Sequence, residues 1–169
     1  MTKLVPQNHP ALHTIAESVT EEDFKNGTVE KIIRGLKKAL LTYSVDGFIP
    51  VAIAAPQIGI SKRIFIIDDQ SDSKNRDPLP KIIAINPQIL KTSKTTHLVE
   101  EGCLSLPELY GKVRRHTKVT LSALDEGAKP YQRGASGLMA QIIQHENDHL
   151  DGILFTDKAE EVWKIQTKS

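Results

Sequence analysis

The stretch GLMAQIIQHENDHLDG, residues 137–152, predicts the helix on which the fold of this protein is centred. Helical spacing of its apolar residues extends from about Ser136 to Leu150, with Ser136 as a possible N-cap and Gly152 as the end. Runs of residues typical of strands precede this helix and do not alternate strictly with other helices. The pattern therefore favours an α+β domain.

The same helix carries the arrangement H-E-x-x-H at residues 145–149. His145 and His149 lie one turn apart on one face, where both imidazoles can reach a single metal ion, and Glu146 can act as a general base. The alternative is a chance group of polar residues on a solvated face. An interior face is favoured, because the histidines continue a largely apolar stripe formed by Leu138, Gln141 and Ile142.

A hydrolytic metal site needs a third protein ligand and an open position for water. The only cysteine of the chain, Cys103 in EEGCLSLPE (100–108), is the best candidate, since a thiolate binds zinc or ferrous iron strongly. A lone cysteine is also commonly a small buried hydrophobic residue, which is the alternative interpretation. Weaker candidates follow the helix: Asp151, Asp157, Glu160 and Glu161.

A second helix is predicted over residues 28–44, TVEKIIRGLKKALLTYS, where apolar residues recur at helical spacing. Thr28 is a plausible N-cap and Asp46-Gly47 a plausible stop. The whole chain is expected to form one domain, residues 1–169, in which about 156–169 are a short tail or a marginal helix.

Strands are predicted where the period changes. RIFIIDD (63–69) and KIIAINP (81–87) are short β-branched runs bounded by polar loops. Residues 112–132 alternate in the manner of a β-hairpin that turns at Glu126-Gly127. We therefore expect antiparallel or mixed sheets around the helix of residues 137–152.

Composition excludes several classes of protein. A single cysteine can form no internal disulfide, and the N-terminal MTKLVPQNHP has no charged-then-apolar leader, so a reducing, cytoplasmic setting is expected. No apolar run approaches the roughly 18 residues needed to span a bilayer. The 22 Lys and Arg residues nearly balance the 21 Asp and Glu residues, which predicts neither a broad nucleic-acid-binding face nor a membrane partner.

Three motifs resemble the signatures of one enzyme family, the peptide deformylases. EGCLS (101–105) and QHENDH (144–149) resemble its second and third motifs, and IAAPQIG (53–59) resembles most of its first. They occur in the family's order, and HPALHTIAESV (9–19) resembles its usual opening. The resemblance therefore covers nearly the whole chain.

The resemblance implies a metal-dependent hydrolase that removes the N-formyl group from the formylmethionine end of nascent polypeptides. One divalent metal ion would be held by Cys103, His145 and His149. Fe²⁺ is preferred by resemblance, while the ligand set also suits Zn²⁺, Ni²⁺ or Co²⁺. A transient ribosome contact and a cytoplasmic, bacterial-type location are further implications.

Catalysis is expected from three further residues. Glu146 would take a proton from the attacking water and return it to the departing amine. By family analogy, the backbone N–H of Leu104 and the side-chain amide of Gln57 would donate to the oxyanion. The alternative for Gln57 is a plain turn residue after Pro56.

Three charged residues are expected to orient the metal ligands without binding the ion themselves. Glu101 could accept the free N–H of a ligating histidine, and Arg115 and Asp148 could form an ion pair. If Asp148 instead faces water, that pair does not exist.

A pocket for the methionine side chain is predicted from residues that flank the motifs or precede His145 on its helix, with core packing as the competing explanation. The peptide backbone is expected to pair as an added strand with the segment before the alanines. Tyr110 stands where many bacterial members have arginine. The predicted substrate-binding residues are Val51, Ala52, Ile53, Val99, Leu138, Ile142 and Tyr110.

The first motif departs from the family pattern. Pro50 and Ala52 replace two glycines, and Ile53 takes the place of a leucine. Proline lacks a backbone donor and fixes φ, so we expect hydrolysis to survive with altered geometry on the substrate side. The alternatives are a related metallo-deacylase with a different acyl or peptide preference, a weakly active member that binds peptide ends, and a purely structural metal site. Glu146 argues against the last.

Overall fold

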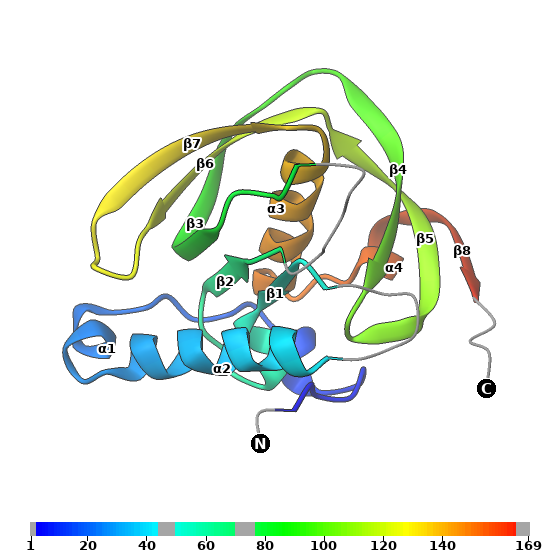
Figure 1. Cartoon of the computed structure of the whole chain (residues 1–169). Helices are drawn as coiled ribbons and strands as arrows, with labels where there is room; N and C mark the ends of the chain where they lie inside the picture. The colour runs from blue at the N-terminus through cyan, green and yellow to red at the C-terminus, as the bar shows by residue number, and fades with distance from the viewer. Residues whose placement is uncertain (1–2, 44–49, 70–76, 165–169) are drawn as a thin grey trace.

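Two antiparallel sheets enclose the helix that carries the two histidines (Figure 1). The computed structural model describes residues 3–43, 50–69 and 77–164. The histidine helix, α3 (Gly137–Leu150), begins directly after Ser136, the N-cap residue, as predicted. The α+β class and the single compact domain are confirmed, and the sheets are antiparallel.

The larger sheet contains the two predicted strands in its middle. Its strand order is β1 (Ala52–Ala54), β2 (Ile64–Ile67), β3 (Ile82–Thr92), β6 (Lys118–Leu124) and β7 (Pro130–Ser136). Its first three strands, β1, β2 and β3, have α3 on one face and α2 (Thr28–Thr42) on the other. Alternate residues of β2 point to opposite faces: Phe65 and Ile67 pack with residues of α3, whereas Ile64 and Ile66 pack with residues of α2. Burial on both faces explains why this strand is a continuous apolar run.

The smaller sheet was predicted only in part. Its order is β4 (Thr96–Cys103), β5 (Leu106–His116) and β8 (Ala159–Lys164). The hairpin predicted over residues 112–132 is correct for β6 and β7 but wrong for residues 112–116, which belong to β5 in this other sheet. The predicted tail is also wrong over most of its described part, because residues 159–164 form a strand paired with β5.

The helices require two further corrections. Thr28 is the first residue of α2 rather than its N-cap, which is Gly27 in the left-handed conformation with φ 78°. The described part of α2 ends at Thr42, and the predicted stop at Asp46-Gly47 lies outside the described residues. The remaining helical elements are short: η1 (Pro10–Leu12), α1 (Glu21–Lys25), η2 (Ala55–Ile58) and α4 (Phe155–Lys158).

Gly152 lies just beyond the end of α3 and permits a close approach of the chain. Its φ is 72°, and a Cβ there would lie 2.8 Å from the backbone nitrogen of Thr14. Only glycine meets both conditions without strain. Among the described residues, none of the helices has the length and apolar character required to cross a bilayer.

Candidate functional site

Three potential metal ligands converge between α3 and the end of β4. Cys103 is the last residue of β4, and His145 and His149 lie one turn apart on α3. One ligand atom from each residue lies within 4.8 Å of the others. The thiol sulfur of Cys103 is 3.3 Å from Nε2 of His149. The structure thus brings together residues that are far apart in sequence, as predicted.

The electrostatics of this group fit a divalent cation. Burial would raise the pKa of the Cys103 thiol, but the charge of His149 and hydrogen bonds from both histidines hold this pKa well below its ordinary value. Burial likewise opposes the charged form of His145, but hydrogen bonds to Cys103 and Glu101 raise its pKa well above the ordinary value. The cluster therefore favours a thiolate next to positive charge, which a bound metal ion provides.

Glu101 orients His145, as predicted, through the ring nitrogen that points away from the metal position. Nδ1 of His145 lies 2.9 Å from Oε2 of Glu101, which leaves Nε2 on the side of Cys103 and the metal position. The carboxylate itself is held by Arg115, whose Nε and Nη2 donate to the two oxygens of Glu101 at 2.7 and 2.8 Å. Burial opposes ionisation, but these donors lower the pKa of Glu101 to about 2.

Asp148 is buried and forms the predicted ion pair. Nη1 of Arg115 donates to its Oδ2 at 2.6 Å. The alternative of a solvated carboxylate is therefore wrong. Lys158, which sequence reasoning did not single out, donates to Oδ1 of the same carboxylate at 2.6 Å.

Glu146 borders the site with the properties of a base. It is 4 % exposed, and its Oε2 has no hydrogen-bond partner among the described residues. Burial raises its pKa to about 7, against the lowering effect of His145 and His149. A carboxylate with a pKa near neutrality can both accept and release a proton at physiological pH.

Gln57, in η2, also contacts the Cys103 thiol. Its Oε1 accepts a hydrogen bond from the Ala54 backbone N–H at 2.9 Å, which turns its Nε2 toward Ser105 Oγ at 3.2 Å and Cys103 Sγ at 3.6 Å. Gln57 is 1 % exposed. This is the environment of a fixed amide donor and not of a plain turn residue. Leu104, in the turn after β4, is buried and borders the same space.

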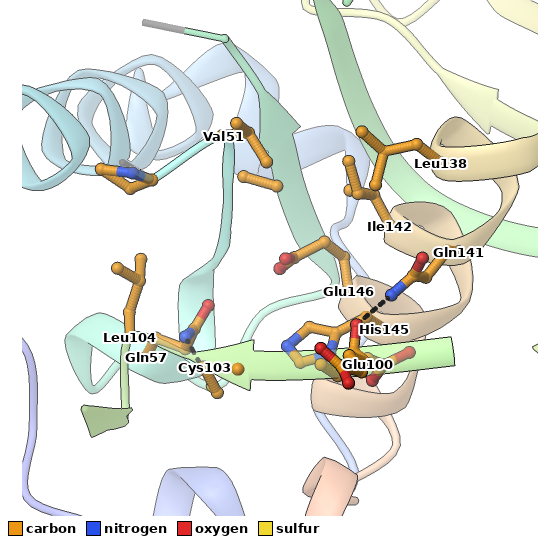
Figure 2. Close-up of a pocket in the computed structure, with 14 residues that line it drawn as sticks. Val51, Gln57, Glu100, Cys103, Leu104, Leu138, Gln141, Ile142, His145 and Glu146 are labelled. Atoms are coloured by element: carbon orange, nitrogen blue, oxygen red, sulfur yellow. Dashed lines mark hydrogen bonds and ion pairs between the residues drawn. The ribbon is translucent and has the colours of Figure 1, made fainter. Parts of the chain in front are cut away.

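A cavity of about 260 Å³ opens beside these groups (Figure 2). It lies against α3 and between β1 and β4, each of which is an edge strand of its sheet. Four of the predicted pocket residues line it: Val51, Ala52, Leu138 and Ile142. Pro50, the unusual residue of the first motif, lines it as well.

Three predicted pocket residues do not line this cavity. Ile53 is fully buried and packs toward α2, on the opposite face of β1 from Ala52. Val99 lies further along β4, where it pairs with Val113. Tyr110 packs its ring over Gly102, where an added Cβ would lie 3.0 Å from the ring.

Two of the lining residues that were not predicted to belong to the site, Gln141 and Glu100, contact each other. Nε2 of Gln141 donates to the backbone oxygen of Glu100 at 2.8 Å and so joins α3 to the free edge of β4 (Figure 2). The signal for Gln141 was its polar side chain within the apolar stripe one turn before His145. Glu100 contributes a main-chain oxygen, for which the sequence gives no signal.

Comparison with known proteins places this site in a family. The family model described as polypeptide deformylase matches residues 1–164. Peptide deformylase 2 of Prochlorococcus marinus (strain MIT 9313) is 38% identical over 158 residues, which are 90% of this chain and 76% of that protein. Peptide deformylase of Synechocystis sp. is 39% identical over 152 residues, with 88% and 78% covered.

Solved structures agree with the sequence relatives. A peptide deformylase from Synechococcus elongatus in complex with actinonin matches with a TM-score of 0.77 and 36% identity, covering 94% of this chain and 78% of that one. A class I type b peptide deformylase from Acinetobacter baumannii bound to Met-Ala-Ser matches with a TM-score of 0.83 and 30% identity, covering 94% and 99%. Sequence, fold and the Cys-His-His group agree, and the chain belongs to the polypeptide deformylase family.

Proposed function

We propose that this protein hydrolyses the N-formyl group of formylmethionyl peptides at the site formed by Cys103, His145, His149 and Glu146. The observation that carries the proposal is the group of Cys103, His145 and His149 at the wall of a cavity, beside a Glu146 carboxylate whose Oε2 has no hydrogen-bond partner in the described part of the chain. A structural metal site has no need for such a base.

The reaction requires water to attack the formyl carbon and the C–N bond to break. Cys103, His145 and His149 would hold a divalent ion, which would supply the Lewis acidity that lowers the pKa of water and polarises a carbonyl. Glu146 accepts the proton of the attacking water and transfers it to the departing amine, so that formate and a free N-terminus result. The Gln57 amide and the Leu104 backbone N–H donate to the oxyanion that develops on the formyl oxygen.

The substrate is proposed to enter as an extended peptide along the free edge of β1. Val51, Leu138 and Ile142 form an apolar wall beside Glu146 that suits a methionine side chain, and the related Acinetobacter enzyme binds Met-Ala-Ser. Because Pro50 offers no N–H, the peptide forms its main-chain hydrogen bonds with Val51 and the residues after it.

Release of formate from formyl-Met-Ala-Ser by nickel-loaded protein tests this function, with acetyl-Met-Ala-Ser as the competing substrate. We expect the formyl peptide to be cleaved much faster. Faster cleavage of the acetyl peptide would instead identify a deacylase with a different acyl preference.

Replacing Leu138 with alanine is predicted to lower kcat/KM for formyl-Met-Ala-Ser roughly tenfold, since about two buried methylene contacts are lost. Formyl-Gly-Ala-Ser, which lacks the side chain, should be unaffected. Leu90→Ala is the matched control, because Leu90 is 45% exposed, against 42% for Leu138, and does not line the cavity. Equal losses for both peptides would place the methionine pocket elsewhere.

The metal is proposed to be Fe²⁺. A set of one thiolate and two imidazoles suits several divalent ions, and the family resemblance favours ferrous iron. Elemental analysis of protein purified without oxygen checks this choice. A zinc-only protein with full turnover would contradict it.

We further propose that the enzyme acts in the cytoplasm and meets its substrate at the ribosome, where formylated N-termini emerge. Sedimentation of the protein with ribosomes that carry formylated nascent chains tests this contact. Protein that stays entirely in the supernatant at micromolar concentrations would contradict it.

A further inference from the structure

Lys158 is the outer end of a chain of charged contacts that leads to a metal ligand. Its Nζ donates to Oδ1 of Asp148 at 2.6 Å, and the other oxygen of Asp148 accepts from Arg115 at 2.6 Å. Arg115 uses its two remaining nitrogens on Glu101, which in turn contacts Nδ1 of His145 at 2.9 Å. Four contacts therefore connect α4 to the imidazole.

With His145 neutral, as a metal ligand must be, the charges of these contacting residues balance only when Lys158 is included. Glu101 and Asp148 are buried carboxylates, and Arg115 carries a single positive charge that both of them contact. Without a second cation, Asp148 would compete with Glu101 for the guanidinium, since an uncompensated buried carboxylate is costly. Lys158 supplies that cation while 43% of its side chain stays exposed, so its own desolvation is modest.

We infer that Lys158 is a positioning residue for His145. By neutralising one oxygen of Asp148, it allows Arg115 to hold both oxygens of Glu101, and the fixed carboxylate orients the imidazole toward the metal position. This inference rests on the proposed metal-dependent function of the site.

The C-terminal segment holds Lys158 in place. Phe155 of α4 is buried and stacks on the His145 ring, with centroids 6.4 Å apart and an interplanar angle of 23°. Strand β8, which follows Lys158 directly, pairs with β5 and is flanked by the ion pairs Lys112–Glu161 and Arg114–Glu160, both at 2.9 Å. The predicted tail, about residues 156–169, thus contains Lys158, which contacts Asp148, and Phe155 immediately before it contacts His145.

The test replaces Lys158 with methionine, which keeps the length and removes the charge, and with arginine, which keeps the charge. We expect Lys158→Met to bind Co²⁺ about tenfold more weakly in competition with a chelator, to shift the thiolate-to-cobalt absorption band, and to lower kcat roughly tenfold with little change in KM. Lys158→Arg should restore all three quantities. Lys112→Met is the matched control, because Lys112 is 36% exposed and pairs with a surface glutamate.

A double substitution distinguishes the loss of charge compensation at Asp148 from a general disturbance of the structure. Adding Asp148→Asn to Lys158→Met removes the uncompensated carboxylate, so cobalt affinity should partly recover. Wild-type cobalt affinity, absorption and kcat in Lys158→Met would overturn the inference, and so would an equal loss in Lys112→Met. Cobalt affinity does not depend on turnover, so a wild-type protein that releases no formate would contradict the proposed function and leave this comparison valid.

Discussion

Glu146→Gln is expected to lower kcat for formyl-Met-Ala-Ser about 10³-fold while the metal-loaded protein keeps its ion. Glutamine has nearly the same shape but cannot accept the proton of the attacking water. The measurement is formate release by the two proteins at equal metal content. Glu126→Gln in the exposed β6–β7 turn is the control and should be as active as the wild type.

The same substitution is expected to stabilise the metal-free protein at alkaline pH. Burial raises the pKa of Glu146 from 4.5 to about 7, so the folded state favours the protonated form. Below pH 4.5 the carboxyl group is protonated in both the folded and the unfolded state, so it does not lower the free energy of unfolding. The free energy of unfolding falls as the pH rises from 4.5 toward 7, and this loss reaches about 3 kcal/mol above pH 7.

Glutamine causes no such loss. Urea unfolding at pH 8 should therefore show Glu146→Gln to be the more stable metal-free protein, whereas the two should converge near pH 4.5. Full activity in the variant would identify another base. Lower stability of Glu146→Gln at pH 8 would show that the Glu146 carboxylate stabilises the fold, against this prediction.

Arg115→Met is expected to reduce the free energy of unfolding by about 3–5 kcal/mol at pH 7, because Glu101 and Asp148 would lose their shared buried cation. The neighbouring residue offers a matched control. Arg114 lies on the same strand and pairs with Glu160 at 2.9 Å, but its side chain is 54% exposed, so Arg114→Met should cost less than about 1 kcal/mol.

The effect of Arg115→Met should depend on pH in a defined direction. In the wild type, the pKa of Glu101 is lowered from 4.5 to about 2, so its ion pair stabilises the fold above pH 4.5 and this contribution is lost as the pH falls toward 2. The difference between wild type and variant should therefore shrink with acidification. Denaturant unfolding of both proteins at pH 7 and pH 3.5 measures it. An equal loss at both values, or an equal loss for Arg114→Met, would contradict this account.

The sequence predicts those parts of the fold that local periodicity determines. Helices α2 and α3 carry long amphipathic patterns, and β2 is an apolar run buried on both faces, so each was identified without knowledge of its neighbours. Strand β8 could not be found in this way. Its residues AEEVWK are mostly exposed, and its pairing with β5 depends on contacts distant in sequence.

The same distinction applies to the site. His145, Glu146 and His149 share one helix, so their spacing alone indicates their geometry, and the motif around Cys103 supplies the third ligand. Side-chain direction was missed where it depends on strand alternation: Ile53 follows Ala52 in β1 and must therefore point to the opposite face. The contact between Lys158 and Asp148 required the path of the chain beyond α3, which no local pattern encodes.

The most direct test of the central claim is a titration of metal-free protein with Ni²⁺ while formate release from formyl-Met-Ala-Ser is followed. Activity is expected to rise in proportion to added metal and to reach its plateau at one ion per chain, because one Cys-His-His group binds one ion. Turnover by the metal-free protein, or a plateau at two ions per chain, would contradict this claim.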